Sequence, residues 1–449
     1  PAISLGKNAD TQRRTASLSP LNNYNKIGHS TLRAQNLQSL MLNSISVCRL
    51  PDELGSLQNL TSLKIFCCPE LEALPSTLSN LQNLSLLEIS ACSALKRLPT
   101  DLQKLENLET LSLNMCPELC SIETFPRHVE CLKIKNLSSL RALPSQIGDL
   151  SDLTTLIIGD CHNLVEIPSE IGRLGRLSYL DISHCAGLPE LPAEVLDLGK
   201  LQTLRICSCR GIQSMPPSLR PLTALEDLKV SRCTQMTQLP ADLDQLPNLE
   251  KLDLSYCQRD ALFDLFAHKW NEKCSLKDLS LEGCRVGDDF FTKILANLPT
   301  KLIALDLDDT GITSLDGFFS SKSGHGLPRG IVDLDLSNSP FLEYSDSKYH
   351  QSSLERLLER YPCLEYIGTN DDESSFSLQT YFMLRFNEAG RALLRSDGLK
   401  PSIPAYLWPY VLSRVQNVVQ HVGRNDSKCM EASILFEFLH GPVMLDSRQ

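Results

Sequence analysis

Residues 153–174 read LTTLIIGDCHNLVEIPSEIGRL, in which aliphatic residues, one cysteine and one proline follow a fixed spacing. The opening phrase, [LV]-x-x-L-x-[LIV] or a close variant, recurs along the chain. We number positions in each copy from its first residue, so that Cys161 stands at position +8. Copies start at Leu37, Leu60, Leu84, Leu108, Val129, Leu153, Leu177, Leu201, Leu225, Leu249, Leu276, Leu302 and Ile331. From Leu60 to Leu249 the step is 24 residues, except for one step of 21 residues. The chain therefore contains about thirteen copies of one unit.

The residue pattern of each copy predicts a strand, a turn and a short helical segment. In the unit that begins at Leu84, aliphatic residues at positions 0, +3 and +5 are typical of a strand with one buried face. Pro99 ends the extended run, and Leu102 and Leu105, three residues apart, suit a short 3₁₀ segment on the outer side. One unit cannot bury its own apolar side, so the units must stack. The pattern predicts an α/β solenoid, a curved horseshoe with a parallel β-sheet on its concave face.

The cysteines follow the same period. Nine of the 17 cysteines stand at position +8: Cys68, Cys92, Cys116, Cys161, Cys185, Cys209, Cys233, Cys257 and Cys284. Stacking turns this column into a ladder of thiols near the turn after each strand, where a small, weakly donating side chain tolerates burial. A ladder of buried thiols favours a reducing compartment, so we expect a cytoplasmic protein.

The whole pattern, L-x-x-L-x-[LI]-x-x-C-x-x-L-x-x-[LI]-P-x-x-[LI]-x-x-L, resembles the leucine-rich repeats of plant intracellular immune receptors. It is also similar to the repeats of type III effectors from plant-pathogenic bacteria. The resemblance covers about residues 37–342. It implies the solenoid fold, a plant-type defence or host–pathogen setting, and an intracellular location, because extracellular repeats commonly carry Asn at position +8.

The two ends depart from the period. Residues 1–36 are polar and predict a flexible segment or a partial N-terminal cap. We expect the repeat domain to span residues 37–367, with amphipathic helices at 259–273, 288–298 and 354–361, a mobile loop at 320–330 and a last edge strand at 364–367. Apolar residues at helical spacing in residues 376–449 predict a helical cap for the end of the core; the alternative is a docking segment for a partner.

The overall charge narrows the class of partner. The chain has 449 residues and a net charge of −11, which argues against binding to nucleic acid, because phosphate binding needs an excess of Lys and Arg. No apolar run is long enough to predict a membrane span. We expect a monomer that binds a protein.

Signals of enzymatic chemistry are missing from the sequence. We find no H-E-x-x-H, G-x-S-x-G or P-loop motif, so we predict no catalytic residue, no cofactor and no metal site. Cys429, between His421 and His440, is a weak candidate nucleophile, and a lone cysteine on a helix is more often part of a core. The alternative function is substrate recognition for a ubiquitin ligase.

The surface between the buried leucines remains as the candidate site. Residues at positions +2, +4, +6 and +7 should lie on the concave face. Two aromatic anchors and a basic patch are expected in the middle of the array: Tyr179, Tyr256, Arg205, Lys229, Arg232 and Lys251. Acidic side chains beside and beyond them are Asp181, Asp253, Asp278, Glu282, Asp306, Asp308, Asp333 and Asp335. This separation of charge favours a charged, complementary protein partner on the concave face.

Overall fold

The structure is a computed structural model. It describes residues 2–3, 15–18, 26–27, 36–319, 326–328, 330–339, 347–361, 363–364 and 366–368. The chain divides into two compact units, Pro1–Leu249 (unit 1) and Glu250–Gln449 (unit 2), which we describe separately.

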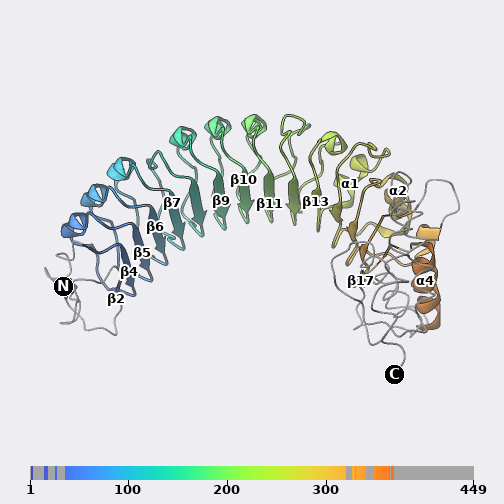
Figure 1. Cartoon of the computed structure of the whole chain (residues 1–449), viewed down its shortest axis with the longest axis horizontal. Coiled ribbons are helices and arrows are strands. Elements are labelled where there is room, and N and C mark those ends of the chain that lie inside the picture. Colours follow the sequence, from blue (N-terminus) through green and yellow to red (C-terminus); the bar gives the residue numbers. More distant parts are fainter. Residues whose placement is uncertain are drawn as a thin grey trace, which may run out of the picture. The chain divides into compact units, whose positions relative to one another are not determined.

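Unit 1 is built on a parallel sheet in which each strand pairs with the next along the chain (Figure 1). Its strands are β2 (Thr15–Leu18), β4 (Ser39–Asn43), β5 (Ser62–Phe66), β6 (Leu86–Ser90), β7 (Thr110–Asn114), β8 (Cys131–Lys135), β9 (Thr155–Gly159), β10 (Tyr179–Ser183), β11 (Thr203–Cys207) and β12 (Asp227–Ser231). The short strands β1 (Ala2–Ile3) and β3 (Lys26–Ile27) pair with each other in parallel. The predicted parallel solenoid is confirmed in this unit.

The strand register reproduces the sequence period. Tyr179 of β10 lies opposite Thr203 of β11, an offset of one 24-residue unit. Thr110 of β7 lies opposite Cys131 of β8, so the 21-residue step is absorbed without a change of register. The missing residues come from the segment after Leu119. There the buried aliphatic and aromatic residues before Val129 are Ile122 and Phe125, whereas the repeat from Leu84 buries Leu98, Leu102 and Leu105 in the same stretch.

Within unit 1 the leucines of successive repeats form a continuous core. In the unit from Leu84, the residues at 0, +3, +5 and +8 are fully buried, as are Leu102 and Leu105 on the outer side. The cysteine column is buried as expected, and from Cys68 to Cys233 each ladder thiol donates to the carbonyl at position +6 of its own repeat, for example Cys161 Sγ to Gly159 O at 3.3 Å. Cys284 Sγ instead donates to Leu254 O at 3.0 Å. The thiol is a second donor to the +6 carbonyl: Gly159 O also accepts the backbone N–H of Asn136 at 2.9 Å.

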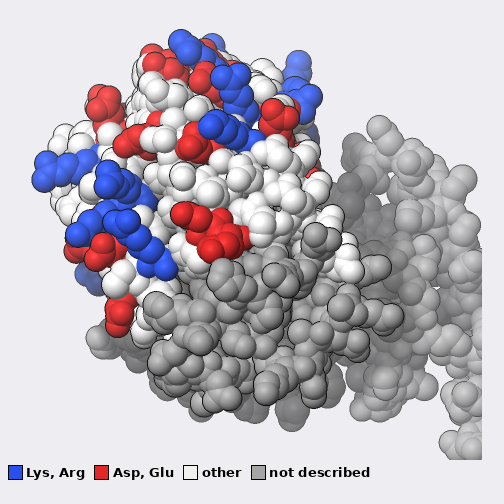
Figure 2. Space-filling view, turned by 90° about the vertical axis from the view of Figure 1, so that its left-hand side faces the viewer, with Lys and Arg blue, Asp and Glu red and all other residues white. Residues whose placement is uncertain are grey.

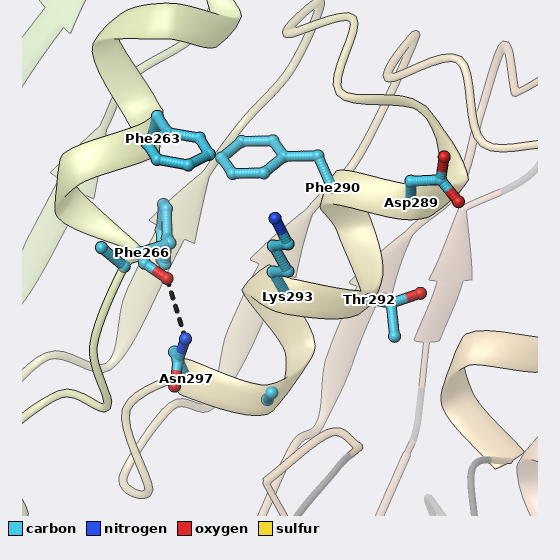
Figure 3. A pocket seen from close by; sticks show the side chains of 9 residues that line it. Phe263, Phe266, Asp289, Phe290, Thr292, Lys293 and Asn297 are labelled. Carbon is cyan, nitrogen blue, oxygen red and sulfur yellow. Dashed lines mark hydrogen bonds between the residues drawn. The ribbon is translucent and has the colours of Figure 1, made fainter.

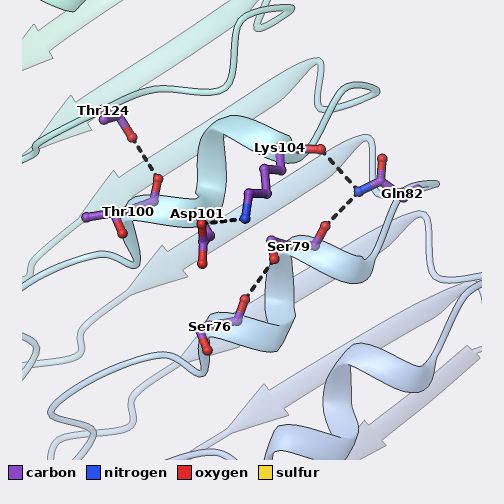
Figure 4. Close-up of polar contacts among 7 residues, drawn as sticks. All are labelled: Ser76, Ser79, Gln82, Thr100, Asp101, Lys104 and Thr124. Atoms are coloured by element: carbon purple, nitrogen blue, oxygen red, sulfur yellow. Dashed lines mark hydrogen bonds and ion pairs between the residues drawn. The ribbon is translucent and has the colours of Figure 1, made fainter.

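Short 3₁₀ helices form the outer side of unit 1, opposite the strands in Figure 1. They are η1 (Asp52–Ser56), η2 (Ser76–Asn80), η3 (Thr100–Lys104), η4 (Ser145–Asp149), η5 (Ser169–Arg173), η6 (Ala193–Asp197) and η7 (Leu243–Gln245). The proline of the repeat precedes η1 to η6 in an extended conformation, such as Pro99 at φ −62°. Side chains link successive helices: Gln82 Nε2 donates to Ser79 O at 2.7 Å and to Lys104 O at 3.1 Å (Figure 4).

Unit 2 repeats the parallel strands but replaces the proline turns by helices. Its strands are β13 (Lys251–Asp253), β14 (Asp278–Ser280), β15 (Ala304–Asp306), β16 (Asp333–Asp335) and β17 (Tyr366–Gly368). Its helices are α1 (Arg259–Leu265), α2 (Gly287–Asn297), η8 (Asp316–Phe319) and α4 (Ser347–Arg360). The predicted edge strand is confirmed, because β17 pairs with β16. The predicted helix at 288–298 is confirmed as α2.

The helix predicted at 259–273 is wrong in length, because α1 ends at Leu265. Tertiary hydrogen bonds replace the next helical turn. Asn297 Nδ2 donates to Phe266 O at 2.8 Å, and the Trp270 N–H donates to Asn297 O at 3.2 Å. The apolar residues after Leu265 therefore fill the core from an irregular segment.

Every repeat turns at position +7 through a left-handed residue. Their φ angles lie between 50° and 66°, and most are not glycine: Ser44, Cys67, Ala91, Met115, Asn136, Asp160, His184, Ser208, Arg232, Tyr256, Gly283, Asp309 and Asn338. The N–H of such a residue donates to the +6 carbonyl of the next unit, as from Ala91 to Asn114 at 3.0 Å. The turn thus extends the ladder and aims the +8 thiol into the core.

Two predictions fall on residues that the structure does not place. The helical cap or docking segment at 376–449 lies outside the described residues, as does most of the loop at 320–330. The domain boundaries stay a prediction.

Candidate partner-binding face

The strands of unit 1 present a regular face. From β4 to β12, residues at +3 and +5 are buried and residues at +2 and +4 are half-exposed. This alternation follows from the strand period of two and matches the expected concave rows. The side chains of this face are held on a paired sheet, which fixes their spacing.

Three adjacent strands bring together a tyrosine, an arginine and an aspartate. Arg205 on β11 lies between β10 and β12, and its Nη2 donates to Asp227 Oδ2 at 3.3 Å. On the other side its guanidinium carbon lies 5.7 Å from the centre of the Tyr179 ring. We call Tyr179, Arg205 and Asp227 the β10–β12 cluster. Asp227 was missed by the sequence analysis, although its +2 position placed it in register with Tyr179.

The cluster keeps its arginine charged. Partial burial works against the guanidinium charge, but the hydrogen bond to Asp227 and the nearby Tyr179 and Asp181 outweigh it and raise the pKa of Arg205. Burial also raises the pKa of Tyr179, which therefore keeps its hydroxyl proton. The cluster offers an aromatic ring, a fixed cation and hydrogen-bond donors.

The other predicted residues of unit 1 flank this cluster. Asp181 and Lys229 lie in register with Arg205, and the Ser183 hydroxyl donates to Asp181. Arg232 is exposed at position +7 after β12. The expected basic patch needs correction here, because the ion pair with Asp227 makes the surroundings of Arg205 mixed in charge.

Cations and anions also alternate at the end of unit 1 that Figure 2 shows, where Lys and Arg are interspersed with Asp and Glu. Lys64 and Glu88, on neighbouring strands of the face, pair at 3.1 Å. Surface pairs of this kind contribute little to stability.

Unit 2 carries the predicted acidic residues on neighbouring strands. Asp278 of β14 is in register with Lys251 of β13, and Asp306 of β15 with Asp335 of β16. Asp333 is exposed beside Asp335, whereas the remaining predicted residues are half-exposed: Asp253, Tyr256, Glu282 and Asp308. We call the carboxylates of β14 to β16 and their following turns the acidic row.

The acidic side chains at position +4 also shape their own strands. Asp253 accepts the N–H of Ser255 at 2.9 Å, Asp306 that of Asp308 at 3.0 Å, and Asp335 that of Ser337 at 2.8 Å. Such local bonds compete with the ladder, which explains why strands β13, β15 and β16 end at this residue whereas those of unit 1 run to +6.

Burial and crowding disfavour the ionised form of three side chains in the acidic row. Burial, and then repulsion from neighbouring carboxylates, raises the pKa of Asp306, Asp308 and Asp333. Hydrogen bonds from Ser280 to Asp306 at 2.8 Å and from Asn338 to Asp308 at 2.8 Å oppose this shift in part. A cation brought to this row would relieve the repulsion.

Burial makes several of the ladder thiols weak nucleophiles, whereas a hydrogen bond with Cys92 lowers the pKa of Cys116. Burial raises the pKa of Cys161 and Cys233 to about 11 and that of Cys185 and Cys284 to about 12. Among the described residues, no group of three or more His, Cys, Asp or Glu side chains could hold a metal ion. The same part of the chain contains no helix that is long and apolar enough to cross a membrane. Cys429 lies outside the described residues.

Comparison with known proteins agrees with this architecture. A family model described as "Leucine-rich repeat region" matches residues 146–280. A second, "Plant disease resistance protein RPS2-like, leucine-rich repeats", matches residues 30–186. No curated protein sequence is similar enough to count as a relative.

Three solved structures are similar to this chain to different degrees. A leucine-rich-repeat protein from Leptospira interrogans is 22% identical with a TM-score of 0.50, over 80% of this chain and 90% of its own. The leucine-rich-repeat domain of the type III effector XopL is 26% identical with a TM-score of 0.41, over 55% of this chain and 77% of its own. InlJ from Listeria monocytogenes, whose functional domain includes a cysteine ladder, is 18% identical with a TM-score of 0.44, over 76% and 64%.

The repeat period, the parallel ladder, the two family models and the Leptospira fold lead to one conclusion. The chain is a leucine-rich-repeat protein.

Proposed function

We propose that this protein is a non-catalytic scaffold in the cytoplasm that recognises a protein partner through its strand face. Leucine-rich-repeat scaffolds typically bind other proteins. Because one fold can carry many functions, the residues that line the strands decide which partner is bound. The match to plant disease resistance repeats over residues 30–186 supports a setting in immune or host–pathogen signalling.

The β10–β12 cluster carries this proposal. Tyr and Arg are the residue types most often found at the energetic centre of interfaces, because each combines a large contact area with directed hydrogen bonds. Here Tyr179 and Arg205 are both half-exposed, lie in contact and project from paired strands. A partner that covers them therefore meets groups that are already ordered, which lowers the entropic cost of binding.

The acidic row supports a second region of contact for a segment rich in Lys or Arg. Its carboxylates lie on the paired strands β14 to β16 and in the turns that follow them, and burial together with mutual repulsion raises the pKa of Asp308 and Asp333. A basic partner would relieve the repulsion. Charge complementarity of this kind mainly raises the association rate and the specificity.

The test is an affinity purification from cell extract with the full chain and two charge-reversed variants. One variant carries Arg205→Glu and Lys229→Glu, and the other carries Asp306→Lys and Asp308→Lys. Matched controls reverse exposed charges away from the strands, with Lys96→Glu and Arg173→Glu in unit 1 and Glu272→Lys and Asp316→Lys in unit 2.

We expect the same partner to be retained by both controls and lost from one or both strand-face variants, with circular dichroism unchanged. Retention of all partners by both strand-face variants would exclude the strand face as the binding site.

A further inference from the structure

A groove on the helices of unit 2 is separate from the strand face. It measures about 670 Å³ and lies between α1 and α2, lined chiefly by Phe263, Phe266, Phe290, Lys293 and Asn297 (Figure 3). Unit 1 has short 3₁₀ turns at the corresponding place in its repeats. The groove therefore exists only because the irregular repeats carry helices there.

The groove exposes an aromatic pair. The ring of Phe263 stacks on that of Phe290, with centroids 5.9 Å apart and planes at 14°. Phe290 is buried, but Phe263 is 51% exposed, one of the few large apolar side chains left so open among the described residues. An exposed ring supported by a second ring is a ready contact for an apolar side chain.

Two cationic side chains, Lys293 and Arg259, lie within cation–π distance of these rings. Lys293 Nζ lies 5.4 Å from the centre of the Phe263 ring, and the Arg259 guanidinium lies 5.3 Å from that of Phe290. Neither makes an ion pair with a carboxylate in the part of the chain that the structure describes. In Figure 3 Lys293 points toward the aromatic pair, whereas the carboxylate of Asp289 points away from it. Lys293 therefore supplies the positive charge beside the rings, although Asp289 also lines the groove.

The groove is preformed. The Asn297 side chain at the end of α2 donates to Phe266 O just after α1. In return, the backbone N–H of Trp270, whose side chain is buried in the core, donates to Asn297 O. These bonds fix the separation of the two helices without any ligand. A fixed apolar groove with a few placed charges is typical of a binding site.

We propose that this groove binds a short peptide segment of another protein, in which a large apolar side chain is followed closely by Asp or Glu. The apolar side chain covers the exposed ring of Phe263, and the carboxylate pairs with Lys293 beside it. Complementary charge favours an acidic residue here, because a basic one would meet the Lys293 ammonium, which points toward the aromatic pair. The groove gives the scaffold a second binding surface that does not compete with the strand face.

The test uses a random-peptide phage library selected on the immobilised full chain, with depletion on a Phe263→Ala/Lys293→Glu variant. A synthetic peptide of the enriched sequence is then titrated by fluorescence anisotropy. We expect an apolar–acidic motif, and binding at least about tenfold weaker to Phe263→Ala and to Lys293→Glu. The matched controls Ile303→Ala and Lys273→Glu, exposed positions away from the groove, should bind as the parent does.

Two results would overturn the proposal. The first is an enriched peptide that binds the Phe263→Ala variant as tightly as the parent, or a selection that yields no enriched motif. The second is a full chain that is dimeric by light scattering and becomes monomeric in Phe263→Ala, which would assign the groove to a second copy instead of a peptide.

Discussion

The ring of Tyr256 lies against the backbone of Gly283, so closely that a Cβ on Gly283 would come within 2.4 Å of two ring carbons. Both residues stand at position +7 of successive repeats, and both are left-handed, with φ of 57° and 66°. The glycine is therefore needed twice, once for its backbone angle and once to make room for the ring. The arrangement holds Tyr256, the aromatic anchor predicted in unit 2, in a defined orientation beside the acidic row.

Gly283→Ala should lower the free energy of unfolding by about 2–3 kcal/mol, since it adds a left-handed alanine and a clash with the ring. The control is Gly287→Ala, at φ 65° with no atom within 4 Å of its Cβ, which should cost only about 1 kcal/mol. Urea unfolding followed by circular dichroism measures both. Adding Tyr256→Ala to Gly283→Ala should recover the difference. Equal losses in the two single variants would contradict the contact between Tyr256 and Gly283.

Ala91→Gly should stabilise the protein, by about 0.5 kcal/mol, although this substitution usually destabilises. Ala91 has a φ of 56°, and relief of its left-handed strain exceeds the added entropy of glycine in the unfolded chain. Ala94→Gly, three residues later and without a positive φ, should instead cost about 0.5–1 kcal/mol. Thermal melting of the two variants gives the signs, and a lower melting temperature for both would refute the argument.

The leucine period was sufficient to predict the parallel ladder and the burial of the +8 cysteines, because each depends on spacing within a single unit. The left-handed +7 column was not predictable in this way. Residues as different as Met115 and His184 occupy it, since the ladder bond from the +7 N–H imposes the angle whatever the side chain.

The candidate site was predicted less completely, because contacts between repeats depend on side-chain reach. The +2 and +4 positions of the repeats correctly predicted that Tyr179 and Arg205 lie on the strand face. They did not predict the ion pair between Arg205 and Asp227, which joins position +4 of one repeat to position +2 of the next. The end of α1 at Leu265 also depends on a contact between two repeats, which the sequence pattern of one repeat does not contain. Asn297, thirty-two residues later in the chain, supplies the bond that stops it.

Asp333→Asn should raise stability at pH 7 by about 0.5 kcal/mol, as expected for removal of one of several like charges on paired strands. Folding raises the pKa of Asp333, so protonation of this side chain at low pH favours the folded state. That favourable contribution to the free energy of unfolding is lost as the pH rises through the folded-state pKa, whereas the asparagine side chain of the variant carries no charge at any pH. The gain should therefore shrink as the pH falls and vanish below the ordinary aspartate pKa of 3.8. Urea midpoints from about pH 3 to about pH 8 test this, with the exposed Asp264→Asn on α1 as control. A gain that does not depend on pH would argue against charge repulsion.

The cysteine ladder should resist alkylation in the folded protein. With a pKa of about 12, only about one Cys185 thiol in ten thousand is ionised at pH 8, and the side chain is fully buried as well. Cys67, one residue before the ladder position of its repeat, is exposed. Iodoacetamide labelling at pH 8, quantified per peptide by mass spectrometry, should modify Cys185 at least about a hundredfold more slowly than Cys67. About 6 M guanidinium chloride is enough to unfold an ordinary domain. Under these conditions the alkylation rates of Cys185 and Cys67 should converge, because unfolding exposes both thiols to solvent. Equal rates in the native state would mean that the units open often enough to expose the ladder, and that its burial is not maintained in solution.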